Sequence, residues 1–230
     1  MTLINDFISL IYPKTCMACG KSLYKNEDCL CTYCLYHLPK TNFHLEKDNE
    51  VERVFWGRVR IESAASFLYF SKGGKVQKIM HKLKYKGRQE IGVFLGEQYG
   101  LELLNSDTFK NIDIIIPVPL HKMKLKKRGY NQSEKFAEGL SLSMKKPVST
   151  DNLYRKIFSE TQTKKTRYKR WQNVESIFDI KNPELLKSKH ILLVDDVITT
   201  GATMEACVNV LKKVPEIKIS IASIAYASNL

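Results

Sequence analysis

One segment near the carboxyl end of the chain constrains the fold more than any other. The aliphatic run Ile191–Val194 has the composition of a strand that is buried on both faces. Two acids, Asp195 and Asp196, follow it directly, then the small and polar residues Thr199–Thr203, and helical periodicity continues over residues 202–213. A strand, a polar turn and a helix in this order predict an α/β fold, with the turn at the sheet edge where ligands bind.

Further elements of both kinds precede and follow this segment. The other predicted strands lie in Gly57–Phe70, Asn111–Val118 and Ile217–Tyr226. Apolar periodicity predicts helices at Gly73–Leu83, Gln89–Leu104 and Asn131–Met144. Because strands alternate with helices, we expect a mostly parallel sheet flanked by helices.

The turn that follows Asp195 and Asp196 has the chemistry of a phosphate site. Gly201 lets the backbone approach an anion closely, and the amides of Thr199–Thr203 lie at a helix N-terminus, where the dipole favours negative charge. Asp195 and Asp196 would repel that phosphate. We therefore expect them one ligand length away, where they accept hydrogen bonds from sugar hydroxyls or hold Mg²⁺. Helix capping alone explains one or two of these residues, but not the whole pattern.

Five of the six cysteines lie within residues 16–34. Four of them form two Cys-x-x-Cys pairs: Cys16, Cys19, Cys31 and Cys34. Two such turns supply the four thiolates of a tetrahedral zinc site, and the zinc is expected to be structural because a segment this short buries little apolar area. Disulfides are the alternative, which the paired spacing and a reducing compartment disfavour. Cys29 is interpreted as a bystander.

We expect two domains, an N-terminal helix with the four-cysteine zinc module over residues 1–45 and an α/β domain over residues 46–230. Leu3, Phe7 and Leu10 have helical spacing, which favours a short amphipathic helix over a signal peptide. No apolar run approaches the roughly 20 residues that cross a bilayer. The cytoplasm is therefore the expected location, without membrane insertion.

The net charge is +13, with 37 basic and 24 acidic residues, which favours an anionic partner, although many soluble proteins are also basic. A phosphorylated metabolite, nucleic acid or an anionic membrane would fit. The basic run Lys122–Arg128 suits pyrophosphate and equally a nucleic-acid backbone. In Gln162–Phe178 basic residues alternate with Tyr168 and Trp171, which suits stacking on bases or an active-site lid.

The segment Leu192–Thr203 closely resembles the signature of type I phosphoribosyltransferases, which bind 5-phosphoribosyl-1-pyrophosphate (PRPP). The resemblance implies that Asp195 and Asp196 contact the ribose hydroxyls, with Mg²⁺ bridging ribose and pyrophosphate. It implies that the 5-phosphate lies in a loop of five residues: Thr199, Thr200, Gly201, Ala202 and Thr203. It places the pyrophosphate at the loop after an earlier strand, at Pro117, Val118, Pro119 and Arg128.

Together with the cysteine pairs, three further blocks make the chain similar to the ComF family: His81–Arg88, Pro117–Gln132 and Thr163–Val174. This resemblance implies a cytoplasmic role in handling incoming single-stranded DNA during natural transformation, with other competence proteins as possible partners. Residues expected to contact DNA or to form a lid are Lys84, Lys86, Arg88, Lys126, Lys127, Lys164, Lys165, Arg167, Tyr168, Arg170 and Trp171. Two other functions stay open: a Mg²⁺-dependent phosphoribosyltransferase acting on an unidentified acceptor in nucleotide metabolism, and a PRPP-sensing regulator.

Overall fold

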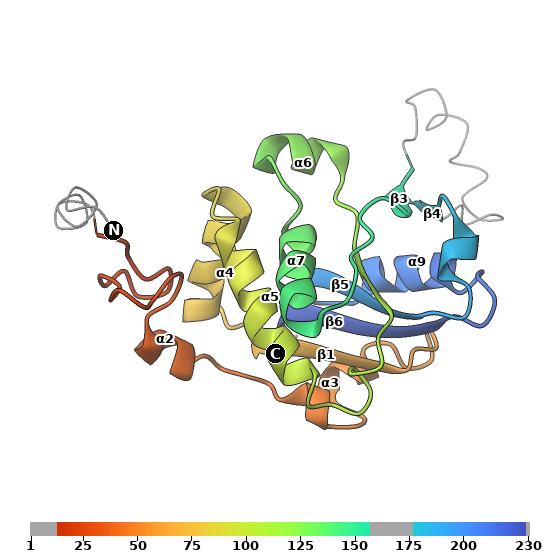
Figure 1. Ribbon diagram of the computed structural model, residues 1–230, viewed down its shortest axis with the longest axis horizontal. Coiled ribbons are helices and arrows are strands. Elements are labelled where there is room, and N and C mark those ends of the chain that lie inside the picture. The colour runs from red at the N-terminus through yellow and green to blue at the C-terminus, as the bar shows by residue number, and fades with distance from the viewer. Residues whose placement is uncertain (1–12, 157–176, 229–230) are drawn as a thin grey trace.

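The computed structural model describes residues 13–156 and 177–228 of the 230-residue chain. Its centre is a four-stranded sheet in which every neighbouring pair is parallel (Figure 1). In spatial order the strands are β1 (Ser63–Tyr69), β6 (Lys218–Tyr226), β5 (His190–Ile198) and β2 (Ile114–Pro117). The parallel sheet confirms the predicted α/β fold class.

The strand register creates an overhang at the carboxyl edge of the sheet. The last pair between β2 and β5 is Pro117 with Val194, whereas β5 continues beside β6 until Ile198 pairs with Tyr226. Proline has no backbone N–H to donate, which suits the end of a ladder. Asp195, Val197 and Ile198 are therefore paired on the β6 side, and residues 195–198 are open on the β2 side within the part of the chain that is described.

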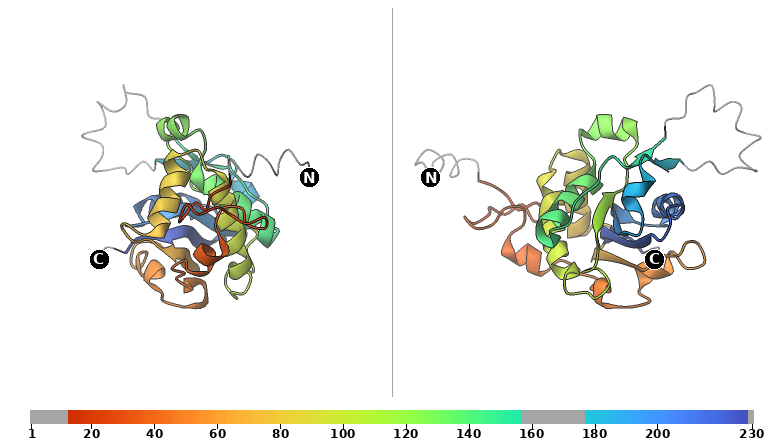
Figure 2. Two further views of the ribbon diagram at one scale, coloured as in Figure 1. Left: turned by 90° about the vertical axis from the view of Figure 1, so that its left-hand side faces the viewer. Right: turned by 45° about the vertical axis from the view of Figure 1, so that its right-hand side comes forward.

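Helices cover both faces of the sheet. Figures 1 and 2 show α4 (Lys75–Tyr85), α5 (Glu90–Leu103) and α7 (Gln132–Met144) on one face and α9 (Ala202–Leu211) on the other. The helices α5 and α7 cross with their backbones in contact, because a Cβ on Gly96 or Gly139 would collide with a main-chain carbonyl of the other helix. This close pair fixes the start of α7 over the overhang of β5.

The smaller elements are short helices and one hairpin. The helices are α2 (Thr32–Tyr36), η1 (Phe43–Leu45), α3 (Glu50–Arg53), α6 (Lys122–Arg128) and η3 (Pro183–Leu186). The antiparallel hairpin comprises β3 (Leu153–Arg155) and β4 (Phe178–Ile180). The described helices include none that is long and apolar enough to cross a membrane.

Three predicted elements differ from those observed. The strand β5 runs through Asp195 and Asp196 to Ile198 instead of ending at Val194, because β6 pairs with it along that length. The first strand covers only Ser63–Tyr69 of Gly57–Phe70. The basic run expected to be a loop is the helix α6, whose Lys, Met, Leu and Arg residues are good helix formers. The predicted N-terminal helix lies almost entirely outside the described residues.

Candidate functional site

The four paired cysteines meet at one point, within a segment that we call the cysteine module (residues 13–36). The sulfur atoms of Cys16, Cys19, Cys31 and Cys34 all lie within 4.8 Å of one another, and Cys19 Sγ is 3.8 Å from Cys31 Sγ. A tetrahedron with zinc–sulfur bonds of about 2.3 Å has sulfur–sulfur edges of about 3.8 Å. All six cysteines are free, and Cys29 lies outside the cluster. The donor set therefore fits a four-coordinate metal ion.

Backbone amides shape this cluster. Gly20, at φ +80°, closes the first turn by donating its N–H to Cys16 O at 2.9 Å, and Cys31 N donates to Cys16 Sγ at 3.3 Å. Burial would raise the pKa of Cys16, but amides of Cys19, Cys31 and Ala18 outweigh it and lower this pKa to about 6. Burial and the neighbouring thiols raise the pKa of Cys34 to about 12. A cation bound by all four sulfurs would hold them as thiolates, against the raised pKa of Cys34.

At the carboxyl edge of the sheet, β5 leads through an exposed turn into α9. Thr199, Thr200 and Thr203 are exposed, and Gly201 has φ +71° as the N-cap of α9. A small cavity of about 50 Å³ opens here, lined by Asp195 and by residues 197–204. The predicted phosphate loop is therefore accessible and has one of the predicted acids on its wall.

Residues ahead of β1 hold this loop in place from outside. The Arg58 guanidinium donates to Thr200 O at 2.6 Å and forms an ion pair with Glu205 in the first turn of α9. A Cβ on Gly201 would lie 2.6 Å from Cγ1 of Val54, so only glycine leaves room for the α3 end to pack here. The sequence did not identify Arg58, because nothing local links it to a loop 142 residues away.

The two acids have different partners. Asp195 Oδ1 accepts from Ser133 Oγ at the start of α7 and from the backbone N–H of Asp196, both at 2.8 Å. Asp196 Oδ1 lies 3.1 Å from Lys84 Nζ in the last turn of α4. Burial and the charge of Asp196 together raise the pKa of Asp195 to about 7. A cation or hydroxyl donors placed between these carboxylates would relieve that repulsion.

The end of α4 also contacts the predicted pyrophosphate region. The Arg128 guanidinium lies 5.3 Å from the centre of the Tyr85 ring, and its Nη1 donates to Gln132 Oε1 at 2.6 Å. The Tyr130 hydroxyl donates to Leu83 O. These two contacts fasten the loop that begins at the half-buried Pro119 to the end of α4.

The remaining predicted contacts fall into three groups. Lys126 and Lys127 are exposed on α6, and Lys86 and Arg88 are exposed after α4, where Arg88 Nη1 is 3.4 Å from Glu90. Pro117 and Val118 are buried at the end of β2. The others lie outside the described residues: Lys164, Lys165, Arg167, Tyr168, Arg170 and Trp171.

The sequence analysis did not identify Ser133, because the sequence marks it only as one more polar residue at a helix start.

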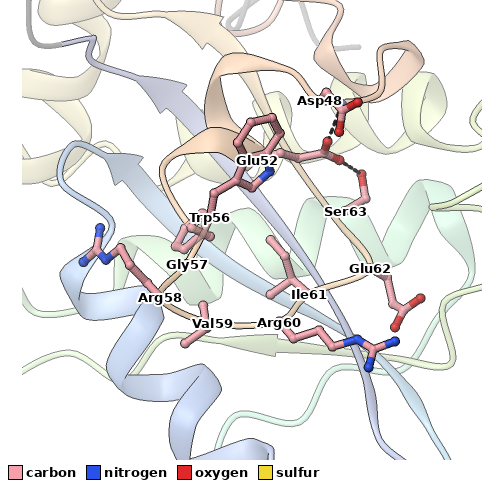
Figure 3. A pocket seen from close by; sticks show the side chains of 11 residues that line it. Asp48, Glu52, Trp56, Gly57, Arg58, Val59, Arg60, Ile61, Glu62 and Ser63 are labelled. Atoms are coloured by element: carbon pink, nitrogen blue, oxygen red, sulfur yellow. Dashed lines mark hydrogen bonds between the residues drawn. The ribbon is translucent and has the colours of Figure 1, made fainter.

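A larger hollow of about 570 Å³ lies between α3 and the start of β1 (Figure 3). Its acid Glu52 already accepts from Ser63 Oγ at 2.6 Å and from Asp48 N at 2.7 Å. Arg58, at its rim, is engaged with the phosphate loop. We do not assign the predicted ligand to this hollow, because Glu52 and Arg58 already have other partners and both Asp195 and Asp196 lie elsewhere.

Comparison with known proteins adds to this geometry. Residues 117–229 match the family described as "Phosphoribosyl transferase domain". The chain is 28% identical over 200 residues to the competence protein ComFC of Bacillus subtilis. The aligned region covers 83% of this chain and 75% of that protein. It is 27% identical over 193 residues to the DNA utilization protein YhgH of Shigella flexneri, covering 82% and 80% respectively. It is 31% identical over 116 residues to the competence protein F of Haemophilus influenzae, covering 50% and 51%.

Proposed function

This chain belongs to the ComF family of proteins with a phosphoribosyltransferase domain, and on that premise we propose that it binds PRPP and handles single-stranded DNA in the cytoplasm during natural transformation. The observation that carries the PRPP part is the overhang of β5. It presents two acids, open on one side, next to an exposed threonine-rich loop at the N-terminus of α9.

We propose that the 5-phosphate of PRPP lies in the turn Thr199–Thr203, where backbone amides, hydroxyls and the helix dipole favour an anion. Asp195 and Asp196 would then accept from the ribose hydroxyls, and Arg128 would contact the pyrophosphate. Mg²⁺, when bound, neutralises charge between pyrophosphate and ribose oxygens. Arg58 keeps the loop in shape through Thr200 O, and Ser133 orients Asp195.

For the cysteine module we propose a structural zinc ion held by Cys16, Cys19, Cys31 and Cys34. The sulfur spacing supports zinc, because the 3.8 Å between Cys19 Sγ and Cys31 Sγ fits a tetrahedral four-sulfur site. Four protein ligands leave no open position on the ion, so its role would be to hold the module in shape.

The DNA part of the proposal is supported by the names of the relatives and by charge. The helix α6 has no buried residue and carries five basic side chains between Lys122 and Arg128. Lys86 and Arg88 are also exposed after α4, whose end contacts α6 through Tyr85 and Arg128. Contacts of this kind bind the phosphate backbone without reading sequence, so affinity should fall steeply with salt.

The first experiment is calorimetric titration of the zinc-loaded protein with PRPP and Mg²⁺, then with a short single-stranded oligonucleotide at two salt concentrations. We expect both ligands to bind the wild type, and the double variant Asp195→Asn/Asp196→Asn to lose PRPP but keep DNA. Absence of PRPP binding in the wild type would refute the ligand assignment. DNA binding that is absent or insensitive to salt would refute the DNA role. Pyrophosphate release with a nucleobase or amine acceptor would favour the transferase alternative.

A further inference from the structure

Lys84 occupies a distinctive place beside the proposed PRPP site. Its Nζ lies 3.1 Å from Asp196 Oδ1, and the two side chains are only 22% and 14% exposed. Among the described residues, it is the one cation that forms an ion pair with either of the two acids. Sequence reasoning grouped Lys84 with the DNA or lid contacts and did not connect it to Asp196.

This ion pair uses an oxygen that the proposed ligand also needs. A ribose hydroxyl or Mg²⁺ at Asp196 Oδ1 would compete with the Lys84 ammonium for the same lone pairs, because one carboxylate oxygen accepts few partners at once. Mg²⁺ that takes Asp196 Oδ1 would therefore displace Lys84 Nζ from that oxygen. Where the ammonium goes next decides whether Lys84 opposes or assists binding.

The contacts on either side of Lys84 limit its movement to the side chain. Leu83 O accepts from the Tyr130 hydroxyl, and the Tyr85 ring lies under the Arg128 guanidinium at 5.3 Å. The backbone is thus held at both neighbours, while the four-carbon chain of Lys84 can rotate. Lys84 directly precedes Tyr85, whose ring contacts Arg128, the residue proposed to contact pyrophosphate.

We infer that Lys84 is an exchangeable counter-ion: it neutralises Asp196 in the free protein and moves to the pyrophosphate when Mg²⁺ and PRPP bind. This inference rests on the proposed PRPP site and assigns a positioning role to a residue outside the signature loop. It makes the site selective for ribose phosphates that carry a diphosphate, because only those offer the displaced cation a new anionic partner.

The test uses Lys84→Gln with three calorimetric titrations of the full-length, zinc-loaded protein: Mg²⁺ alone, Mg²⁺ with ribose 5-phosphate, and Mg²⁺ with PRPP. Without the competing ammonium, Mg²⁺ and ribose 5-phosphate should bind about 3- to 10-fold more tightly than to the wild type. PRPP should bind about tenfold more weakly, because a charge-assisted contact to its diphosphate is lost. The two effects have opposite signs, which a general loss of structure cannot produce.

Two variants serve as controls. Lys78→Gln removes the same charge from an exposed position of the same helix and should change none of the three affinities. Lys84→Arg keeps a cation and should restore PRPP binding to within about threefold of the wild type, since arginine also binds phosphate. Equal weakening of all three ligands in Lys84→Gln would overturn the inference in favour of a structural role. Equally tighter binding of all three ligands in Lys84→Gln would show that Lys84 does not move to the pyrophosphate. If the wild type itself does not bind PRPP, the proposed function fails irrespective of Lys84.

Discussion

The cysteine module and the sheet domain keep their shapes by different means. In the module the fully buried side chains are chiefly those of cysteines, such as Cys16 and Cys34, and the largest fully buried side chains of the described chain all lie from Phe55 onward. The sheet excludes water with aliphatic strands and with rings such as Phe67 and Tyr99, stacked 4.9 Å apart. Apolar burial can therefore hold the sheet, whereas the module has few large buried side chains and would depend on the metal ion proposed at its thiols.

The comparison teaches where each region can tolerate change. A core of many side chains distributes its stability, so a polar site at its edge can be strained without unfolding the domain. A module held by the four ligands of the proposed metal ion would have no such reserve.

Removing one sulfur ligand should have the largest effect. We expect Cys34→Ser to lose the bound metal and the order of residues 13–36, because structural zinc supplies about 10–16 kcal/mol in small modules of this kind. Metal analysis measures the bound ion, and amide hydrogen exchange measures the order of the module. The amides of β5 and β6 should stay protected from exchange. Cys29→Ser is the matched control and should keep the metal, since Cys29 lies outside the cluster. If residues 13–36 stay protected from hydrogen exchange after the metal is lost, the module does not differ from the sheet domain in what stabilises it.

At the sheet edge, Gly201→Ala should damage the site more than the fold. Gly201 has φ +71°, and its new Cβ would meet Val54 and Phe55, so the phosphate loop must shift. We expect PRPP affinity to fall about 100-fold and the free energy of unfolding to fall by about 1–3 kcal/mol. Gly73 has a similar φ of +79° with open space around it. Gly73→Ala should therefore lower the free energy of unfolding through backbone strain and leave PRPP affinity unchanged. Equal PRPP affinities in both variants would contradict this view of the loop.

The raised pKa of Asp195 predicts a pH-dependent stability cost. Burial and the charge of Asp196 raise this pKa from an ordinary 3.8 to about 7, so the folded chain binds the proton more tightly than the unfolded chain. Stability from this group is complete below about pH 4 and is lost as the pH rises through about 7.

Asp195→Asn should therefore match the wild type near pH 4 and exceed its stability by about 1–3 kcal/mol near pH 8. Chemical denaturation across this pH range measures the difference. Asn can still accept from Ser133, so the fold is preserved while PRPP binding weakens. A gain that does not depend on pH would show that ionisation of Asp195 is not its cause.

The smallest effect concerns the core of the sheet domain. Within the described chain, the buried Tyr99 hydroxyl has no hydrogen-bond partner, and His44 Nδ1 nearby has none either. Tyr99→Phe should raise the free energy of unfolding by about 1 kcal/mol, because an unsatisfied buried hydroxyl is removed. Thermal unfolding detects this change. A loss of stability would mean that the hydroxyl has a partner, such as a water shared with His44.

Local patterns were sufficient for much of the fold. The aliphatic runs around Ile115 and Leu192 are buried strands, and the apolar faces of α4, α5 and α7 lie where their periodicity placed them. The spacing of the cysteine pairs anticipated their convergence, since each turn needs only a few residues to bring two sulfurs together. These features depend on neighbours in sequence, and so the sequence by itself determined them.

Other features depended on segments that meet only in the folded chain. The length of β5 was set by its pairing with β6, and α6 formed where family resemblance suggested a loop. The contacts of Arg58 with Thr200 and of Lys84 with Asp196 join residues more than a hundred positions apart. No local propensity encodes such a pair, because its energy exists only after the sheet has aligned the strands. The sequence thus predicted which residues would bind a phosphate, a sugar and a metal, and the fold brought Arg58 and Lys84 to the groups that they contact there.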